Sequence, residues 1–136
     1  MVKTANPMTT WINLASIALG GAAGSVLRYL ITQAASSFPG GSNALGTLSC
    51  NLIGCATIGA FSQYLLTNET LSEASQLAIR VGLLGGLTTF SSFALDAHLL
   101  TEEGKWGLSG LYVSANVLLG WFAVFASMSL VRSWTT

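Results

Sequence analysis

The sequence predicts an all-α membrane protein with four transmembrane helices. Hydrophobic residues make up 51% of the 136 residues and charged residues only 7%, whereas a soluble domain carries about 25% charged residues. The chain also contains four apolar stretches long enough to cross a bilayer, which takes about 20 helical residues. Five basic and five acidic residues cancel, so nucleic acid is not indicated as a partner. The low content of charged residues indicates membrane lipid as the surroundings instead.

The predicted spans cover residues 11–33, 45–66, 77–101 and 107–132, and they leave one transmembrane domain, 1–136, with no soluble part. The apolar run 11–31 in the first span is longer than the ~7–15 residues of a signal-peptide core, so we expect a retained membrane helix. Within it, Gly20 and Gly24 form a small-xxx-small pair, which favours close helix packing in lipid.

The second span carries one amide near its middle, Asn51. Polar groups at this depth usually face the bundle interior and are often functional. The amide could donate to an anion or join two helices, and the sequence leaves both open. Cys50 and Cys55 do not share a helix face, so we expect buried thiols rather than a disulfide or a metal pair.

The third span contains a poor helix interior. Gly85 and Gly86 are followed, after Leu87, by the β-branched Thr88 and Thr89, and these residue types disfavour a helix. We therefore expect this helix to be broken near its middle, where irregular backbone is tolerated only if it is buried in protein or lines a watery cavity. Freed carbonyls would suit a small hard cation such as Na⁺, and freed amides or hydroxyls an anion. A glycine kink without an ion is the alternative.

Two phenylalanines follow this segment. Phe90 and Phe93 are three residues apart and share a helix face. As core residues they need no further explanation, but Ser91 and other hydroxyls crowd beside them. The positive edge of a phenyl ring can attract an anion without holding it tightly, which is what conduction requires.

The fourth span continues the polar pattern. Tyr112 and Asn116 lie four residues apart on one face, with Ser109 one turn earlier, so the three could form a track of hydrogen-bond donors. Asp96 and His98, late in the third span, could equally reach toward the headgroups or pair with a loop.

The basic residues show almost no bias between the two sides of the membrane. Lys3, Arg80 and Arg132 fall on one side and Arg28 and Lys105 on the other, whereas orientation normally follows an excess of Lys and Arg in the cytoplasm. Two copies inserted in opposite directions could pair as an antiparallel homodimer about a twofold axis in the membrane plane. A weakly biased chain with one orientation is the alternative.

The third-span motif resembles that of the Fluc (CrcB) family of small fluoride channels. Residues 85–93 closely match its Gly-Gly-Leu-Thr-Thr-Phe-Ser-Thr-Phe type of signature, and the resemblance covers essentially the whole chain. Less specific matches are Gly46, Thr47, Asn51 and Gly54 in the second span and Gly20, Gly21, Gly24 and Arg28 in the first.

The resemblance implies a dual-topology antiparallel homodimer in the cell inner (plasma) membrane. It would passively export fluoride from the cytoplasm through two pores around a central structural Na⁺, with no organic substrate. The implied residues are Gly85 and Thr88 for Na⁺, and Asn51, Phe90, Ser91, Phe93, Tyr112 and Asn116 for the fluoride pore. The chain departs from the family's pattern at Ala94, Asp96 and Asn116, which affects the polar track.

Three other functions fit the sequence less well. A small dual-topology multidrug exporter needs a membrane-embedded carboxylate, and the first span has none. A structural subunit would leave the Gly-Gly-Leu-Thr-Thr segment and its hydroxyls unexplained. An enzyme is not indicated, because no nucleophile–base or metal-ligand set is present.

Overall fold

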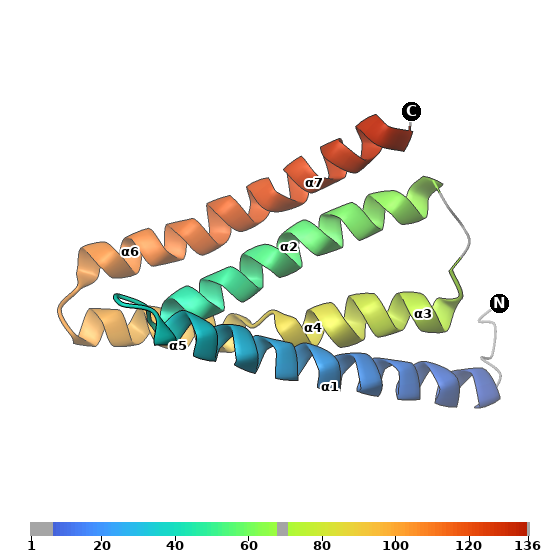
Figure 1. Cartoon of the computed structure of the whole chain (residues 1–136), viewed down its shortest axis with the longest axis horizontal. Coiled ribbons are helices and arrows are strands. Elements are labelled where there is room, and N and C mark those ends of the chain that lie inside the picture. Colours follow the sequence, from blue (N-terminus) through green and yellow to red (C-terminus); the bar gives the residue numbers. More distant parts are fainter. Residues whose placement is uncertain (1–6, 68–70, 136) are drawn as a thin grey trace, which may run out of the picture.

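The computed structural model describes residues 7–67 and 71–135, and over these residues it contains helices and turns but no strand (Figure 1). Lys3, counted above, lies outside them. Four helical stretches are long and apolar enough to cross a membrane, so the predicted all-α architecture with four spans is confirmed. Each is longer than predicted at both ends, because polar residues continue a helix beyond its apolar part. They cover Pro7–Ser37, Asn43–Thr67, Glu73–Glu102 and Trp106–Thr135.

The first two spans are single helices, and the last two are composed of shorter segments. The first span is α1 (Pro7–Ser37) and the second is α2 (Asn43–Thr67). The third comprises α3 (Glu73–Leu77), the π-helical η1 (Ala78–Leu83), α4 (Leu84–Leu87) and α5 (Phe90–Glu102). The fourth comprises α6 (Trp106–Ser114), the π-helical η2 (Ala115–Leu119) and α7 (Gly120–Thr135).

Two residues between α4 and α5 have extended backbone. Thr88 has φ −85° and ψ 153°, and Thr89 has φ −153° and ψ 121°. Gly85 and Gly86, which the sequence grouped with these threonines, are instead helical within α4. Gly86 serves close packing, since a Cβ there would lie 2.6 Å from the Gly21 carbonyl oxygen of α1. The departure from helix is therefore confined to the β-branched pair.

Glycines bring α1 into close contact with the third span. A Cβ on Gly20 would collide with the Ala78 carbonyl oxygen, and one on Gly24 with that of Leu83. From the other side, a Cβ on Gly82 would lie 2.7 Å from the Ile17 carbonyl oxygen. Such backbone-to-backbone contact is how helices associate in lipid. The packing role predicted for the first-span glycines is confirmed.

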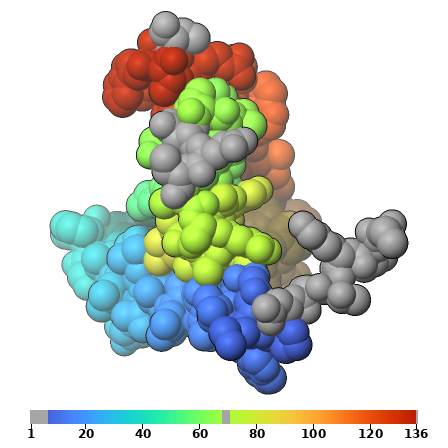
Figure 2. Space-filling model, turned by 90° about the vertical axis from the view of Figure 1, so that its right-hand side faces the viewer, coloured from blue at the N-terminus to red at the C-terminus, as the bar shows by residue number. Residues whose placement is uncertain are grey.

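The second contact joins α2 to α7, which run side by side in Figure 1. Seen end-on, α7 and α2 are stacked above α3, and α1 lies at the bottom (Figure 2). Most large apolar side chains of the fourth span are consequently exposed, including Leu118, Trp121 and Phe125. Both thiols are free; Cys50 is fully buried, as expected, whereas Cys55 is only half-buried. The protomer therefore presents broad apolar surface to whatever surrounds it.

Candidate functional site

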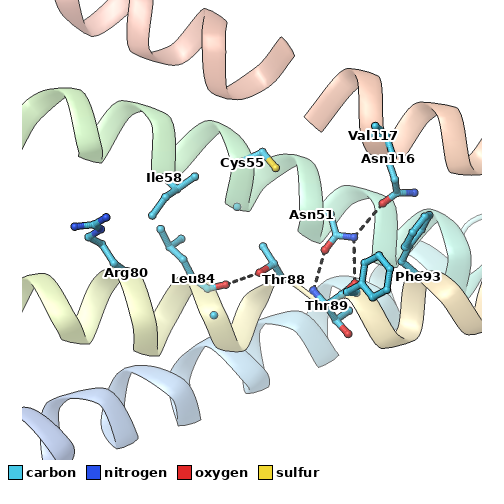
Figure 3. A pocket seen from close by; sticks show the side chains of 13 residues that line it. Asn51, Cys55, Ile58, Arg80, Leu84, Thr88, Thr89, Phe93, Asn116 and Val117 are labelled. Carbon is cyan, nitrogen blue, oxygen red and sulfur yellow. Dashed lines mark hydrogen bonds between the residues drawn. The ribbon is translucent and has the colours of Figure 1, made fainter. Parts of the chain in front are cut away.

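Asn51 of α2 is joined to the extended residue Thr89 by both of its amide atoms (Figure 3). Asn51 Oδ1 accepts the Thr89 backbone N–H at 2.9 Å, and Asn51 Nδ2 donates to the Thr89 carbonyl oxygen at 3.3 Å. The backbone polarity fixes which way the amide points, because its oxygen must meet the N–H and its nitrogen the carbonyl. The Asn51 side-chain oxygen thus takes the place of the carbonyl that would accept the Thr89 N–H in a continuous helix.

Two backbone carbonyls lose their helical donors as a result. In an α-helix the N–H of residue i donates to the carbonyl of residue i−4. The N–H of Thr89 donates to Asn51 instead of Gly85, and the N–H of Ser92 donates to Thr89 Oγ1, at 3.3 Å, instead of Thr88. Apart from Gly85 itself, its chain neighbours and the nearby backbone of its own helix, no atom lies within 4 Å of the Cβ position on Gly85. The carbonyls of Gly85 and Thr88 are thereby left for a partner other than the helix ladder.

Asn116 of η2 extends the hydrogen bonds of Asn51 into the fourth span. Asn51 Nδ2 donates to Asn116 Oδ1 at 3.0 Å, and Asn116 Nδ2 donates to the Tyr112 carbonyl at 3.0 Å. Both N–H groups of Asn51 are therefore engaged within the protomer. Of the two readings that the sequence left open, the structure displays the helix-to-helix hydrogen bond, and an anion would have to compete for one of these donors.

The two phenylalanines lie beside this junction. The ring centroids of Phe90 and Phe93 are 5.5 Å apart, and that of Phe93 is 5.7 Å from the Tyr112 ring. Phe90 is 79% exposed in the protomer, which is far from the burial of a core residue. Both rings line the pocket described next.

A pocket of about 460 Å³, here called the central pocket, lies between α2, the third span and η2. Figure 3 shows its wall, with Asn51, Thr89, Phe93 and Asn116 at one end and Arg80 at the other. Of the residues that the sequence singled out, it is lined by Asn51, Gly85, Thr88, Phe90, Phe93 and Asn116. It combines aromatic rings, amides and backbone oxygens in one mostly apolar space.

Ser91 and Tyr112 are not among the residues that line the central pocket. Ser91 is exposed, with its hydroxyl 3.3 Å from that of Thr89. Tyr112 is 95% buried and donates its hydroxyl to Asp96 Oδ2 at 3.2 Å. The tyrosine hydroxyl therefore points away from the pocket and toward the third span.

Asp96 is the residue whose place sequence reasoning left open. Its Oδ2 also accepts the buried hydroxyl of Thr47 at 2.8 Å, so one carboxylate joins the second, third and fourth spans. Asp96 is the one acidic residue well inside an apolar span, which is a signal of an interior role. His98, by contrast, is exposed and lies 3.5 Å from Glu102.

A second pocket, of about 480 Å³, lies on the other side of Thr89 between α1, α2 and α5. It is the more polar of the two, and Thr89 lines both. Its lining includes Arg28, Thr32, Gln33, Thr47, Ser92 and Asp96. The extended threonine pair thus separates a polar space from an apolar one.

Comparison with known proteins gives one consistent family. The family described as CrcB-like protein, Camphor Resistance (CrcB), matches residues 15–128. Proteins named fluoride-specific ion channel FluC are similar over most of their length. One from Rhizobium etli (strain CFN 42) is 42% identical over 86% of this chain and 94% of its own. One from Agrobacterium fabrum is 41% identical over 90% of this chain and 98% of its own. One from Rhodopirellula baltica is 35% identical over 95% of this chain and 100% of its own.

These relatives are named as ion channels and not as enzymes, which agrees with the absence of an enzymatic motif in the sequence. The four apolar helices and the relatives together make this chain a multi-pass protein of the bacterial plasma membrane. Both the match to the family and the match to the relative from Rhizobium etli cover well over half of the chain. The chain therefore belongs to the CrcB-like family, as the third-span signature indicated.

Proposed function

We propose that the protein is a fluoride-selective channel that lets fluoride leave the cytoplasm passively. The observation that carries the proposal is the junction of Asn51, Thr89 and Asn116 beside the rings of Phe90 and Phe93 in the central pocket. The names of the relatives, which are fluoride-specific ion channels, support the same conclusion.

The chemistry of this pocket favours a small, hard anion. Ring edges attract an anion weakly, whereas amide N–H groups reward the ion with the highest charge density. Fluoride would compete with Asn116 Oδ1 for the Asn51 N–H that donates to it, while the second N–H of the Asn51 amide stays bonded to the Thr89 carbonyl. Ser91, Tyr112 and Asn116 are proposed to continue the path. Such sites are strong enough to admit the ion and weak enough to release it.

The channel is proposed to be an antiparallel homodimer with two pores. The near-absent charge bias permits both orientations. The 79% exposure of Phe90 and the exposed face of the fourth span leave apolar surface that a second copy can cover. Labelling of a single cysteine introduced at the exposed Glu103, in a variant without Cys50 and Cys55, from each side of intact membrane vesicles tests this arrangement. Modification from both sides is expected, and modification from one side only would exclude dual topology.

The third span is proposed to act as a broken membrane helix that contributes to a central Na⁺ site. The carbonyls of Gly85 and Thr88 are the two whose helical donors are diverted to side chains, and neutral hard oxygens suit Na⁺. Two copies around a twofold axis would duplicate the set. When bound, Na⁺ would neutralise the carbonyl dipoles that the missing helical bonds leave exposed.

Current across a planar lipid bilayer tests fluoride conduction directly. With purified protein in the bilayer and a tenfold gradient of potassium fluoride, the current is expected to reverse at the fluoride equilibrium potential, about 59 mV per tenfold for a monovalent ion. A reversal potential that follows potassium, or a current that chloride carries equally well, would reject the proposal.

A further inference from the structure

We propose that Arg80 of η1 is an anion-attracting residue at one mouth of the fluoride path and sets the rate at which fluoride enters. This inference rests on the proposed function, since it assigns a role within the same central pocket. It is carried by the depth of Arg80 in the membrane, by the pocket that it shares with the pore residues, and by the absence of an acidic partner for it among residues 7–67 and 71–135.

Arg80 lies within the membrane-spanning part of the chain. It precedes Thr88 by eight residues in the span Glu73–Glu102, which corresponds to about 12 Å along a helix. If the extended pair is near the midplane, Arg80 remains inside a hydrocarbon core about 30 Å thick. Charged side chains at such depth are costly and generally face a water-filled path or a counter-charge.

Arg80 is part of the lining of the central pocket. Arg80 lines it together with Asn51, Phe90 and Phe93, and is the one charged residue of its described lining. Arg80 also lines a smaller pocket of about 310 Å³ beside Glu73 and Gln76. In Figure 3 its side chain reaches from η1 toward α2, at the end of the pocket opposite Phe93. Arg80 therefore lies at one end of the central pocket, which is the proposed mouth of the fluoride path.

No described residue neutralises this charge. Within 7–67 and 71–135, the ion pairs are His98–Glu102 and Lys105–Glu103, and neither involves Arg80. Glu73 lines the smaller pocket with Arg80 but is not within ion-pair distance. A permeating anion is the counter-charge that the pocket can supply.

The antiparallel dimer gives the two copies of Arg80 separate roles. Inversion about an axis at the extended pair would place them on opposite sides of the midplane, about 24 Å apart along the membrane normal. One positive charge then stands at one mouth of each pore.

Fluoride efflux from liposomes tests the role of the charge through three variants, Arg80→Lys, Arg80→Gln and Arg80→Glu. A unit charge about 10 Å from the ion, at a dielectric between those of water and protein, changes its local concentration about four-fold. At low ionic strength and low fluoride, Arg80→Gln is expected to slow efflux about four-fold, Arg80→Glu more, and Arg80→Lys little. Potassium gluconate near 1 M, with a Debye length of about 3 Å, should bring the variants together.

Lys105→Gln is the matched control, because Lys105 is a cation in the α5–α6 turn that pairs with exposed Glu103; it should conduct at the wild-type rate. If Arg80→Gln releases fluoride at the wild-type rate at every salt concentration, the proposal is overturned, and the guanidinium is assigned to the lipid headgroups instead. Equal, salt-independent losses in the Lys and Gln variants would also overturn it. Arg80→Lys keeps the charge, so a large loss in that variant alone would do the same. If the wild type itself does not conduct, the proposed function fails, which is a separate result.

Discussion

Asn51 and Thr89 are 38 residues apart in the sequence, yet the side chain of one satisfies both backbone groups of the other, at 2.9 and 3.3 Å. This pairing stabilises two extended residues inside a helical span and at the same time removes the helical donor of the Gly85 carbonyl. The same amide reaches Asn116 of the fourth span at 3.0 Å. One side chain therefore links the backbone geometry of the third span to the donors of the central pocket.

Replacement of Asn51 should affect stability and conduction together. Asn51→Ala leaves the Thr89 N–H without its acceptor, at a cost of about 1–3 kcal/mol when that group stays buried, and it removes one donor from the Thr89 carbonyl. Asn51→Asp keeps an acceptor for the N–H but loses the donor and adds a negative charge beside the anion path. Thermal unfolding in detergent and fluoride efflux from liposomes measure the two effects. An Asn51→Asp protein that conducts at the wild-type rate would contradict a role for this amide in the pore.

Replacement of either phenylalanine should suppress fluoride flux by an order of magnitude or more while the dimer persists. Phe90→Ile and Phe93→Ile keep an apolar side chain but remove the ring edge that attracts the anion. Phe122→Ile is the control, because Phe122 is exposed on α7 and is not among the residues lining the central pocket. Efflux is compared at equal amounts of protein, and size-exclusion chromatography checks the dimer. Undiminished flux in both pocket variants would remove the rings from the mechanism.

The space around two glycines, Gly24 in the contact between α1 and the third span and Gly110 in α6, predicts different effects of their replacement by alanine. A Cβ on Gly24 collides with the Leu83 carbonyl, so Gly24→Ala should destabilise the protein by about 1–3 kcal/mol through overpacking. Gly110 in α6 has no atom within 4 Å of its Cβ position, so Gly110→Ala should be neutral or stabilise by up to about 1 kcal/mol. Thermal unfolding of the two variants compares them. Equal melting temperatures would show that α1 can shift without cost.

The Asp96 carboxylate should contribute more than an exposed ion pair. Asp96→Ala deprives the buried hydroxyls of Thr47 and Tyr112 of their acceptor, and hydrogen bonds to a charged group are worth about 1.5–3 kcal/mol each. Tyr112→Phe removes one of the two bonds and should cost less. Glu102→Ala, which loses only the exposed pair with His98, should change stability by less than about 1 kcal/mol. A melting temperature for Asp96→Ala equal to that of Glu102→Ala would contradict this ranking.

The sequence predicted those features that depend on local composition. Apolar runs located all four spans, and the β-branched Thr88 and Thr89 marked the place where the backbone becomes extended. The adjacent glycines were less informative, because a glycine also allows helices to touch, and that is the role of Gly86 against α1.

The sequence could not predict which polar groups meet across the bundle. Thr47 and Asp96 are 49 residues apart, and Asn51 and Asn116 are 65 apart, so their contacts depend on how whole helices rotate and cross. The helical period placed Tyr112 and Asn116 on one face, but not the Tyr112 hydroxyl toward Asp96 rather than toward the central pocket. Arg80 entered only as a loop-side charge, and its place in the central pocket emerged from the structure.

The central claim, selective fluoride conduction, is tested most directly by anion release from liposomes loaded with equal potassium fluoride and potassium chloride. A potassium ionophore is added so that charge does not limit the flow, and ion-selective electrodes follow both anions outside. Rapid release of fluoride is expected, with chloride retained at the level of protein-free liposomes. Fluoride release no faster than from protein-free liposomes, or equal release of the two anions, would contradict it.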